Sequence, residues 1–118
     1  MPVRVVIVDD HPSFRASART LLELEGFEVV GEAADGRSGL KIARELEPEL
    51  VLLDVALPDT NGFEVAARLA GGPSKVVLTS SREQRDLGSR VQSSGALGFI
   101  PKDQLSGYAL AELMRGSP

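Results

Sequence analysis

Residues 50–53 form a run of four apolar side chains that ends at a carboxylate, Asp54. The run does not alternate between apolar and polar residues, which is typical of a strand buried on both faces of a parallel sheet. An acid that ends such a strand lies at the carboxyl edge of the sheet, where ligands bind in open α/β sheets. We therefore interpret Asp54 as a functional group. A loop containing Pro58 and Gly62 follows, and a helical pattern starts at Phe63.

Helical patterns separate this strand from four other short strands. The predicted strands cover residues 3–8, 27–30, 50–53, 75–78 and 98–101. Apolar residues at helical spacing follow each strand, and Gly26, Pro48 and Pro73 mark helix ends. The helix expected over residues 82–94 has the thinnest pattern, with Leu87 and Val91 as its apolar residues. Five strands alternating with five helices predict an α/β, doubly wound parallel sheet in a single domain spanning residues 1–118.

The composition excludes several classes of site and partner. The 118 residues include no cysteine, so disulfides and thiolate metal sites are excluded. With 13 Lys and Arg against 17 Asp and Glu, the net charge is −4, and we expect this chain itself to bind no nucleic acid. The apolar run over residues 5–8 is too short for a signal segment or a membrane span. We expect a soluble, cytoplasmic protein without membrane contact.

Polar side chains follow four of the predicted strands. They are Asp9 and Asp10, Asp54, Thr79 and Ser80, and Lys102. Because parallel strands end at one edge of a sheet, we expect these groups to gather there. Carboxylates this close repel one another, which proteins tolerate when a hard cation such as Mg²⁺ lies among them. A lysine and a hydroxyl can bind phosphoryl oxygens, and one carboxylate would then be the nucleophile that forms an aspartyl phosphate.

This pattern resembles the receiver domain of two-component response regulators over essentially the whole chain. The resemblance rests on Asp9-Asp10, the segment from Asp54 to Gly62, the hydroxyl after the fourth strand, and Ile100-Pro101-Lys102. The opening Val-Asp-Asp-His-Pro-Ser-Phe-Arg is most similar to receivers that are often fused to a helix-turn-helix output domain. The resemblance implies a flavodoxin-like sheet with strand order 2-1-3-4-5.

The resemblance also implies a role for each matching residue. Asp54 corresponds to the phosphoacceptor, Lys102 to the phosphate-pairing lysine, and Phe99 to the aromatic switch residue. The Mg²⁺ ligands would be Asp9, Asp10, Asp54 and the backbone carbonyl of Ala56. The switch hydroxyl is left open: the family's spacing to the lysine favours Ser80, whereas a strand that ends at residue 78 favours Thr79.

By this likeness we expect a signalling switch rather than an enzyme. Asp54 would accept a phosphoryl group in a Mg²⁺-dependent reaction from a partner histidine kinase or a small phosphodonor. Catalysis would be limited to its own phosphorylation and dephosphorylation. The surface formed by the fourth helix, the fifth strand and the last helix would then change its population of states, and an output protein or a second copy of the chain would bind there.

Three alternatives compete with this interpretation. A protein-interaction domain that keeps the fold without phosphorylation would be marked by loss of an acid or of the lysine, and all are present. A magnesium-dependent phosphatase with an aspartyl nucleophile typically carries a second Asp where Ala56 stands. The chain could also be the receiver half of a longer DNA-binding regulator, which the sequence leaves open.

Other residues have simpler interpretations. His11, the single histidine, is expected to be a polar neighbour of the site rather than a metal ligand, because no second imidazole or thiolate accompanies it. Phe99 also suits a half-buried strand aromatic without a switch role. The basic residues Arg82, Arg85 and Arg90 are expected to form a solvated face.

Overall fold

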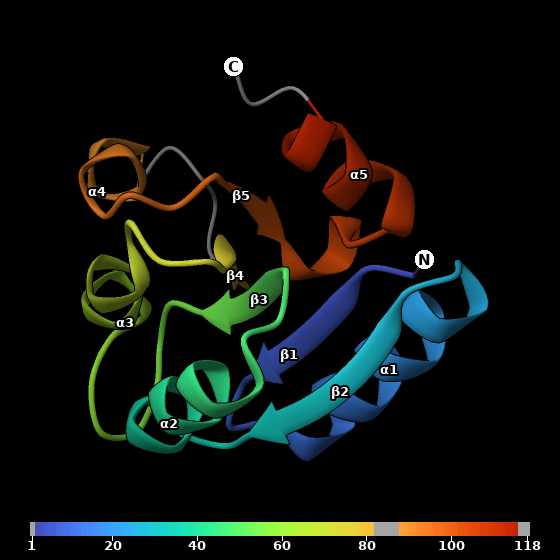
Figure 1. Ribbon diagram of the computed structural model, residues 1–118, viewed down its shortest axis with the longest axis horizontal. Helices are drawn as coiled ribbons and strands as arrows, with labels where there is room; N and C mark the ends of the chain where they lie inside the picture. The colour runs from blue at the N-terminus through green and yellow to red at the C-terminus, as the bar shows by residue number, and fades with distance from the viewer. Residues whose placement is uncertain (1, 82–87, 116–118) are drawn as a thin grey trace.

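A parallel sheet forms the centre of the protein in this computed structural model, which describes residues 2–81 and 88–115. Its strands pair in the order β2-β1-β3-β4-β5, and every pairing is parallel. In Figure 1, β1, β2 and β3 point the same way, and because β4 and β5 also pair in parallel, the carboxyl ends of all five strands share one edge. The predicted fold class and strand order are confirmed. The strands are β1 (Arg4–Val8), β2 (Glu28–Ala33), β3 (Leu50–Asp54), β4 (Lys75–Ser80) and β5 (Gly98–Pro101).

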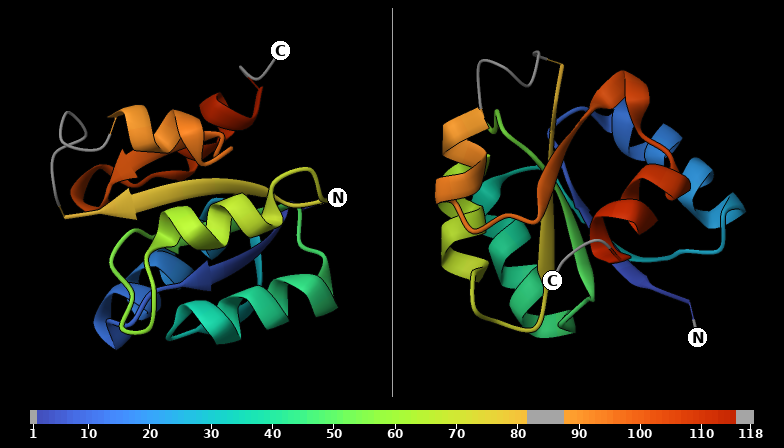
Figure 2. Two further views of the ribbon diagram at one scale, coloured as in Figure 1. Left: turned by 90° about the vertical axis from the view of Figure 1, so that its left-hand side faces the viewer. Right: turned by 90° about the horizontal axis from the view of Figure 1, so that it is seen from above.

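Helices cover the sheet on both faces. In the right-hand view of Figure 2, α2, α3 and α4 lie on one face and α1 and α5 on the other. Each face has its own apolar core, the first containing Ala43, Phe63 and Val91, the second Leu22 and Leu110. The central β1 and β3 are buried on both faces, as their continuous apolar runs predict. The helices are α1 (Pro12–Leu24), α2 (Gly36–Leu46), α3 (Gly62–Leu69), α4 (Gly88–Ser93) and α5 (Gly107–Arg115), with a 3₁₀ turn, η2 (Lys102–Gln104), before the last.

Local chemistry sets the helix ends. The Asp35 side chain accepts a hydrogen bond from the Ser38 amide at 2.7 Å and caps α2, and Asn61 caps α3 in the same way through the Glu64 amide at 3.0 Å. After α1 the chain turns at Gly26, whose φ of +93° is readily adopted by glycine alone. Within the described ranges, no helix is both long and apolar enough to span a membrane.

Several predicted boundaries differ from the structure. Asp54, Thr79 and Ser80 lie within β3 and β4 rather than after them, because the ladder continues through the Val55 amide, which donates to the Thr79 carbonyl at 2.9 Å. Strand β2 runs three residues beyond its predicted end, to Ala33, since it pairs with the whole of β1. Of the helix predicted over residues 82–94, α4 covers residues 88–93, and residues 82–87 lie outside the described ranges.

Candidate functional site

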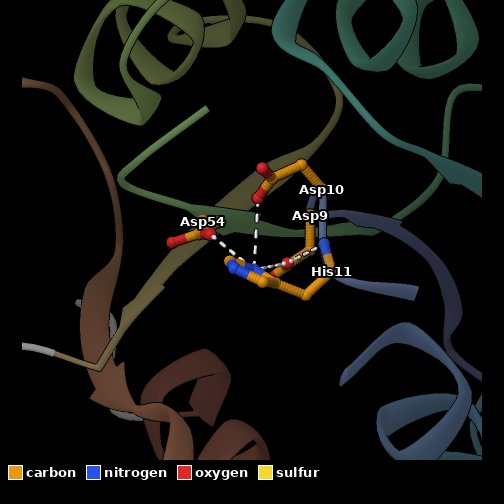
Figure 3. A group of neighbouring side chains, drawn as sticks. All are labelled: Asp9, Asp10, His11 and Asp54. Atoms are coloured by element: carbon orange, nitrogen blue, oxygen red, sulfur yellow. Dashed lines mark hydrogen bonds and ion pairs between the residues drawn. The ribbon is translucent and has the colours of Figure 1, made fainter. Parts of the chain in front are cut away.

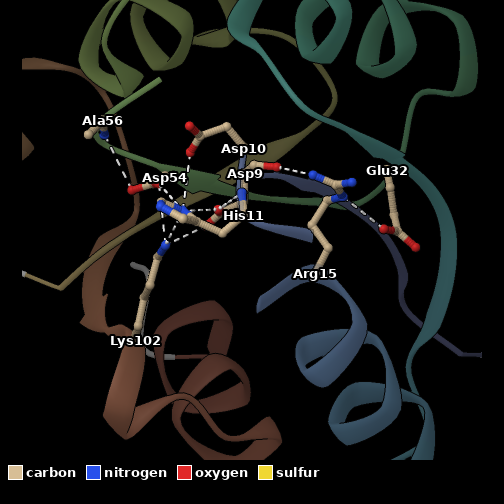
Figure 4. A network of polar contacts seen from close by, with 8 residues as sticks. All are labelled: Asp9, Asp10, His11, Arg15, Glu32, Asp54, Ala56 and Lys102. Carbon is tan, nitrogen blue, oxygen red and sulfur yellow. Dashed lines mark hydrogen bonds and ion pairs between the residues drawn. The ribbon is translucent and has the colours of Figure 1, made fainter. Parts of the chain in front are cut away.

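Side chains from three strand ends meet at the carboxyl edge of the sheet. Asp9 and Asp10 follow β1, Asp54 ends β3, and Lys102 follows β5 directly. The strand order reverses between β1 and β3, and in open α/β sheets ligands bind at such a point. The structure thus brings together the acids that the sequence singled out (Figure 3) and, beside them, the lysine (Figure 4).

The acids form a tight cluster with His11, which we call the acid cluster: Asp9, Asp10, His11 and Asp54. One potential ligand atom from each residue lies within 4.8 Å of the others. The side chains of Asp9 and Asp54 are only 1% and 3% exposed, whereas Asp10 and His11 reach solvent at 36% and 60%. A cluster with two buried carboxylates and one open side has the donor chemistry of a hard divalent cation site.

Lys102 places a positive charge beside the carboxylates of the acid cluster. Its Nζ lies 2.8 Å from Asp9 Oδ2 and 3.3 Å from Asp54 Oδ2, and 4.5 Å from the centre of the Phe14 ring. Partial burial lowers the pKa of Lys102, but the hydrogen bond to Asp9 and the charges of Asp54 and Asp9 outweigh it, so the pKa is raised. Lys102 therefore stays charged at neutral pH.

The pKa of Asp54 is also raised, but in an acid this disfavours the charged form. Burial raises the pKa of its carboxyl group, and the nearby Asp9 charge raises it further. Lys102 and the Ala56 amide, which donates to Asp54 Oδ1 at 3.3 Å, oppose this rise. Three carboxylates face one lysine, so the site retains excess negative charge. A divalent cation would relieve it, and the donor set fits one.

The two candidate hydroxyls lie on opposite faces of β4. Thr79 pairs with Asp54 across β3 and β4, is 1% exposed, and its Oγ1 has no hydrogen-bond partner within the described residues. Side chains alternate between the two faces along β4, so Leu78 and Ser80 lie on the face opposite to Thr79. Leu78 pairs with Phe99 across β4 and β5. Ser80 therefore shares its face with Phe99, which is 6% exposed in the core beside α3 and α4 rather than half-buried as expected.

Two features near the acid cluster lay beyond sequence reasoning. The Arg15 guanidinium donates to the Asp9 carbonyl at 2.6 Å and pairs with Glu32 on β2 at 3.1 Å (Figure 4). His11 Nδ1 lies 2.9 Å from Asp9 Oδ1, well inside the cluster. The only sequence signal for Arg15 is its place one helical turn after the acids, and the sequence carries no signal for the direction of the imidazole.

The loop between β3 and α3 is fixed at both ends. The Gly62 amide donates to the Val55 carbonyl at 2.7 Å. A Cβ atom on Gly62 would lie 2.4 Å from the Asp54 carbonyl oxygen, so this close approach requires glycine. Farther along, the Asp59 carboxylate accepts hydrogen bonds from the Gly36 and Arg37 amides at 2.8 and 3.0 Å, which lowers the pKa of Asp59.

The basic residues predicted to form a solvated face are only partly described. Arg90 is exposed on α4, but its guanidinium lies 4.2 Å from the centre of the Phe63 ring on α3. This cation–π contact joins the two helices. Arg82 and Arg85 lie outside the described residues.

Known proteins share this sequence and this fold. The chain is 46% identical to the virulence-factor transcription regulator BvgA of Bordetella pertussis over 103 residues, which are 86% of this chain and 49% of that protein. It is 36% identical to the response regulator GacA of Pseudomonas aeruginosa over 116 residues, 96% of this chain and 52% of that one. The chain thus spans about half the length of the curated relatives it matches.

Solved structures of receiver domains and response regulators have a similar fold. The signal receiver domain of NarL from Mycobacterium tuberculosis superposes with a TM-score of 0.90 at 34% identity, covering 98% of each chain. A LuxR-family response regulator from Aurantimonas gives a TM-score of 0.85 at 28% identity, covering 98% of this chain and 84% of that one. The family model of the response regulator receiver domain matches residues 5–114. The chain therefore belongs to the response regulator receiver domains of two-component systems.

Proposed function

We propose that this receiver domain accepts a phosphoryl group on the Asp54 carboxylate with the help of Mg²⁺. The observation that carries the proposal is the position of Lys102 Nζ, 3.3 Å from Asp54 Oδ2 and 2.8 Å from Asp9 Oδ2. A fixed ammonium beside a buried carboxylate stabilises the negative charge of a transferring phosphoryl group.

The chemistry is nucleophilic displacement at phosphorus. An oxygen of ionised Asp54 forms a new O–P bond while the P–N bond of a phosphohistidine on a partner kinase breaks, and the electron pair of that bond leaves with the imidazole. Burial and Asp9 disfavour the ionised form of Asp54, and the charge of Lys102 opposes both. Asp9, Asp10, Asp54 and the Ala56 carbonyl would hold Mg²⁺, which neutralises phosphoryl oxygens when bound.

A hydroxyl of β4 then couples the new phosphoryl group to the helices. We assign this role to Ser80, because it shares the Phe99 face of β4 and because the family spacing to Lys102 favours it. The earlier argument for Thr79, that it follows the strand, does not apply to a β4 that continues to Ser80. Thr79, on the face of Asp54, would instead donate directly to a phosphoryl oxygen.

The wider context is also a proposal. Since the chain spans about half of the transcription regulator BvgA and of the response regulator GacA, we propose that it is the receiver half of a longer cytoplasmic DNA-binding regulator. Its input partner would be a histidine kinase. Its output would be an attached domain, another protein or a second copy, bound at the surface of α4, β5 and α5.

Intact-protein mass spectrometry with acetyl phosphate tests the acceptor. The native chain is expected to gain one phosphoryl adduct with Mg²⁺ and none in EDTA, and Asp54→Asn is expected to gain none. The matched control is Asp103→Asn, which removes an exposed acid next to Lys102 and should leave the adduct intact. No adduct and no beryllofluoride binding in the native chain would favour the phosphorylation-independent interaction domain. An adduct that persists in Asp54→Asn would move the acceptor elsewhere.

The two hydroxyls are separated by NMR of the native chain, Ser80→Ala and Thr79→Ala. Beryllofluoride is expected to shift the Phe99 amide resonance in the native chain and in Thr79→Ala, and much less in Ser80→Ala. The reverse pattern would return the coupling role to Thr79.

A further inference from the structure

The imidazole of the single histidine points into the acid cluster rather than away from it (Figure 3). Its Nδ1 lies 2.9 Å from Asp9 Oδ1, 3.1 Å from Asp10 Oδ1 and 3.9 Å from Asp54 Oδ2. We infer that His11 is a further ligand of the cation site and that it makes the site prefer first-row transition ions such as Mn²⁺ over Mg²⁺. The inference rests on the proposed function, because it adds a nitrogen donor to the same site.

The spacing of these atoms suits ligands around one ion. In an octahedral site with bonds of about 2.1 Å, adjacent ligand atoms lie about 3.0 Å apart and opposite ones about 4.2 Å apart. The distances from Nδ1 to Asp9 Oδ1 and to Asp10 Oδ1 match those between adjacent ligands. The distance from Nδ1 to Asp54 Oδ2 lies between the values for adjacent and opposite ligands. The fold therefore holds a nitrogen donor where a fourth protein ligand would lie.

The backbone fixes this position. His11 occupies the N-cap of α1, with extended dihedral angles of −99° and 106°, and Pro12 follows at the first helical position. Its own amide donates to Asp9 Oδ1 at 2.8 Å, so the imidazole and the Asp9 carboxylate belong to one tight turn. A ligand held in this way loses little further freedom when it binds an ion.

The neighbouring groups act on the ring in two directions. The Asp9 and Asp10 carboxylates only accept hydrogen bonds and favour a proton on Nδ1, whereas Lys102, whose Nζ lies 3.4 Å from Nδ1, only donates and favours a lone pair there. With the ring proton on Nε2, which the 60% exposed side chain can turn toward water, the Nδ1 lone pair faces the carboxylate oxygens. Lone pairs directed at one point repel one another, and a cation at that point removes the repulsion.

The ligand atoms determine for which cation His11 increases the binding affinity most. Mg²⁺ is hard and takes oxygen ligands, so an imidazole adds little to its binding. Imidazole nitrogen suits first-row transition ions, whose affinity for mixed nitrogen and oxygen sites rises along the series from Mn²⁺. His11 should therefore strengthen the binding of Mn²⁺ more than that of Mg²⁺.

The test measures Mn²⁺ binding by electron paramagnetic resonance, and Mg²⁺ by competition, on the native chain without a histidine tag, on His11→Ala and on Ser13→Ala. Ser13 is an exposed residue of the same helical turn and serves as the matched control. We expect His11→Ala to weaken Mn²⁺ binding by about tenfold and Ser13→Ala to leave it unchanged. Mg²⁺ binding should change by less than about threefold in His11→Ala. Thermal unfolding confirms that the variants fold.

A second readout reports on the bond itself. Electron spin echo modulation of bound Mn²⁺ should show coupling to a directly bound ¹⁴N nucleus, absent in His11→Ala. Because the chain has one histidine, labelling with [¹⁵N]histidine should remove the ¹⁴N modulation from the native chain. This isotope control assigns the signal without any substitution.

The outcomes separate this inference from the proposed function. If Mn²⁺ binds without ¹⁴N coupling and equally well to His11→Ala, while the Mg²⁺-dependent phosphoryl adduct forms, the inference fails and the proposed function stands. Tighter binding of both ions to His11→Ala would show that the imidazole competes with the cation, which also overturns the inference. If no divalent ion binds and no adduct forms, both fail.

Discussion

Two neighbouring regions of the molecule, the β3–α3 loop and helix α4, are held very differently. In the loop, the Gly62 amide bonds to Val55, Asn61 caps α3, and Asp59 reaches across to the first amides of α2. By contrast, the described α4 has six residues, of which Val91 is buried. Few buried apolar contacts mean low local stability. We therefore expect the loop that follows Asp54 to be the firmly held region and α4 to be the loosely held one.

Gly62→Ala should be the most damaging substitution in the firmly held region. Its Cβ would lie 2.4 Å from the Asp54 carbonyl oxygen and 3.0 Å from Val55 Cα, and backbone atoms cannot swing away as a side chain can. We expect a loss of about 3 kcal/mol in the free energy of unfolding, measured by urea denaturation. A loss below about 1 kcal/mol would mean that the β3–α3 loop can shift to accept the methyl group, which would weaken the contrast between this loop and α4.

Lys102→Ala tests the centre of the site. Removing the ammonium leaves the buried carboxylates of Asp9 and Asp54 without their partner, and we expect a loss of about 2 kcal/mol at pH 7, since the lysine is partly exposed. The raised pKa of Lys102 means that its pairing stabilises the fold below its ordinary value of 10.5. This stabilisation should disappear as the pH rises through the higher folded pKa.

Urea denaturation from pH 6 to 11.5 measures this difference, with Lys102→Arg as the charge-retaining control. A native-minus-variant difference that stays constant to the highest pH would contradict the ion-pair explanation.

Asp59→Asn should have a smaller effect, because Asp59 is exposed and water screens its charge. The Gly36 and Arg37 amides lower the pKa of Asp59 below its ordinary 3.8, so the carboxylate contributes stability above that pH and loses it as the pH falls through the folded pKa. Melting temperatures of the native chain and of Asp59→Asn are therefore expected to differ at pH 7 and converge near pH 2. Asp103→Asn is the exposed control, and an equal shift in that variant would rule out the link to α2.

Gly88→Ala is the matched counterpart of Gly62→Ala in the loosely held region and should have the smallest effect. Among the described residues, no atom lies within 4 Å of a Cβ built on Gly88, so we expect α4 to accept the methyl group. Alanine favours the helix, and we expect a gain of less than about 1 kcal/mol. Hydrogen exchange of the α4 amides should slow. Destabilisation of the size expected for Gly62→Ala would show that α4 is as constrained as the β3–α3 loop.

The sequence predicts the fold well because its signals are local and repeated. Continuous apolar strands, glycine and proline stops and the Asp35 cap all point to one α/β sheet, and the structure agrees. The strand ends are less predictable, because the extension of β4 through Thr79 and Ser80 depends on pairing with β3 and β5. A hydroxyl residue gives no local sign of such pairing.

The meeting of Asp9, Asp54 and Lys102 could be anticipated, because topology alone brings strand ends together. The direction of the His11 ring and the hydrogen bonds from the first amides of α2 to Asp59 could not be anticipated. Both depend on side-chain rotamers and on contacts between segments far apart in the sequence. The bond from Arg15 to the Asp9 carbonyl could not be anticipated either, because it depends on how α1 packs beside β1.

The edges of the sheet have a consequence for how copies of this chain meet. At one edge, Glu32 of β2 is engaged by Arg15 and Arg19 of α1 at 3.1 and 2.7 Å. At the other, β5 has four residues and ends in Pro101, which has no amide hydrogen to donate. Charged, short or proline-bearing edge strands resist the addition of another strand. We expect concentrated solutions to resist edge-to-edge aggregation, and any pairing of copies to proceed through helices.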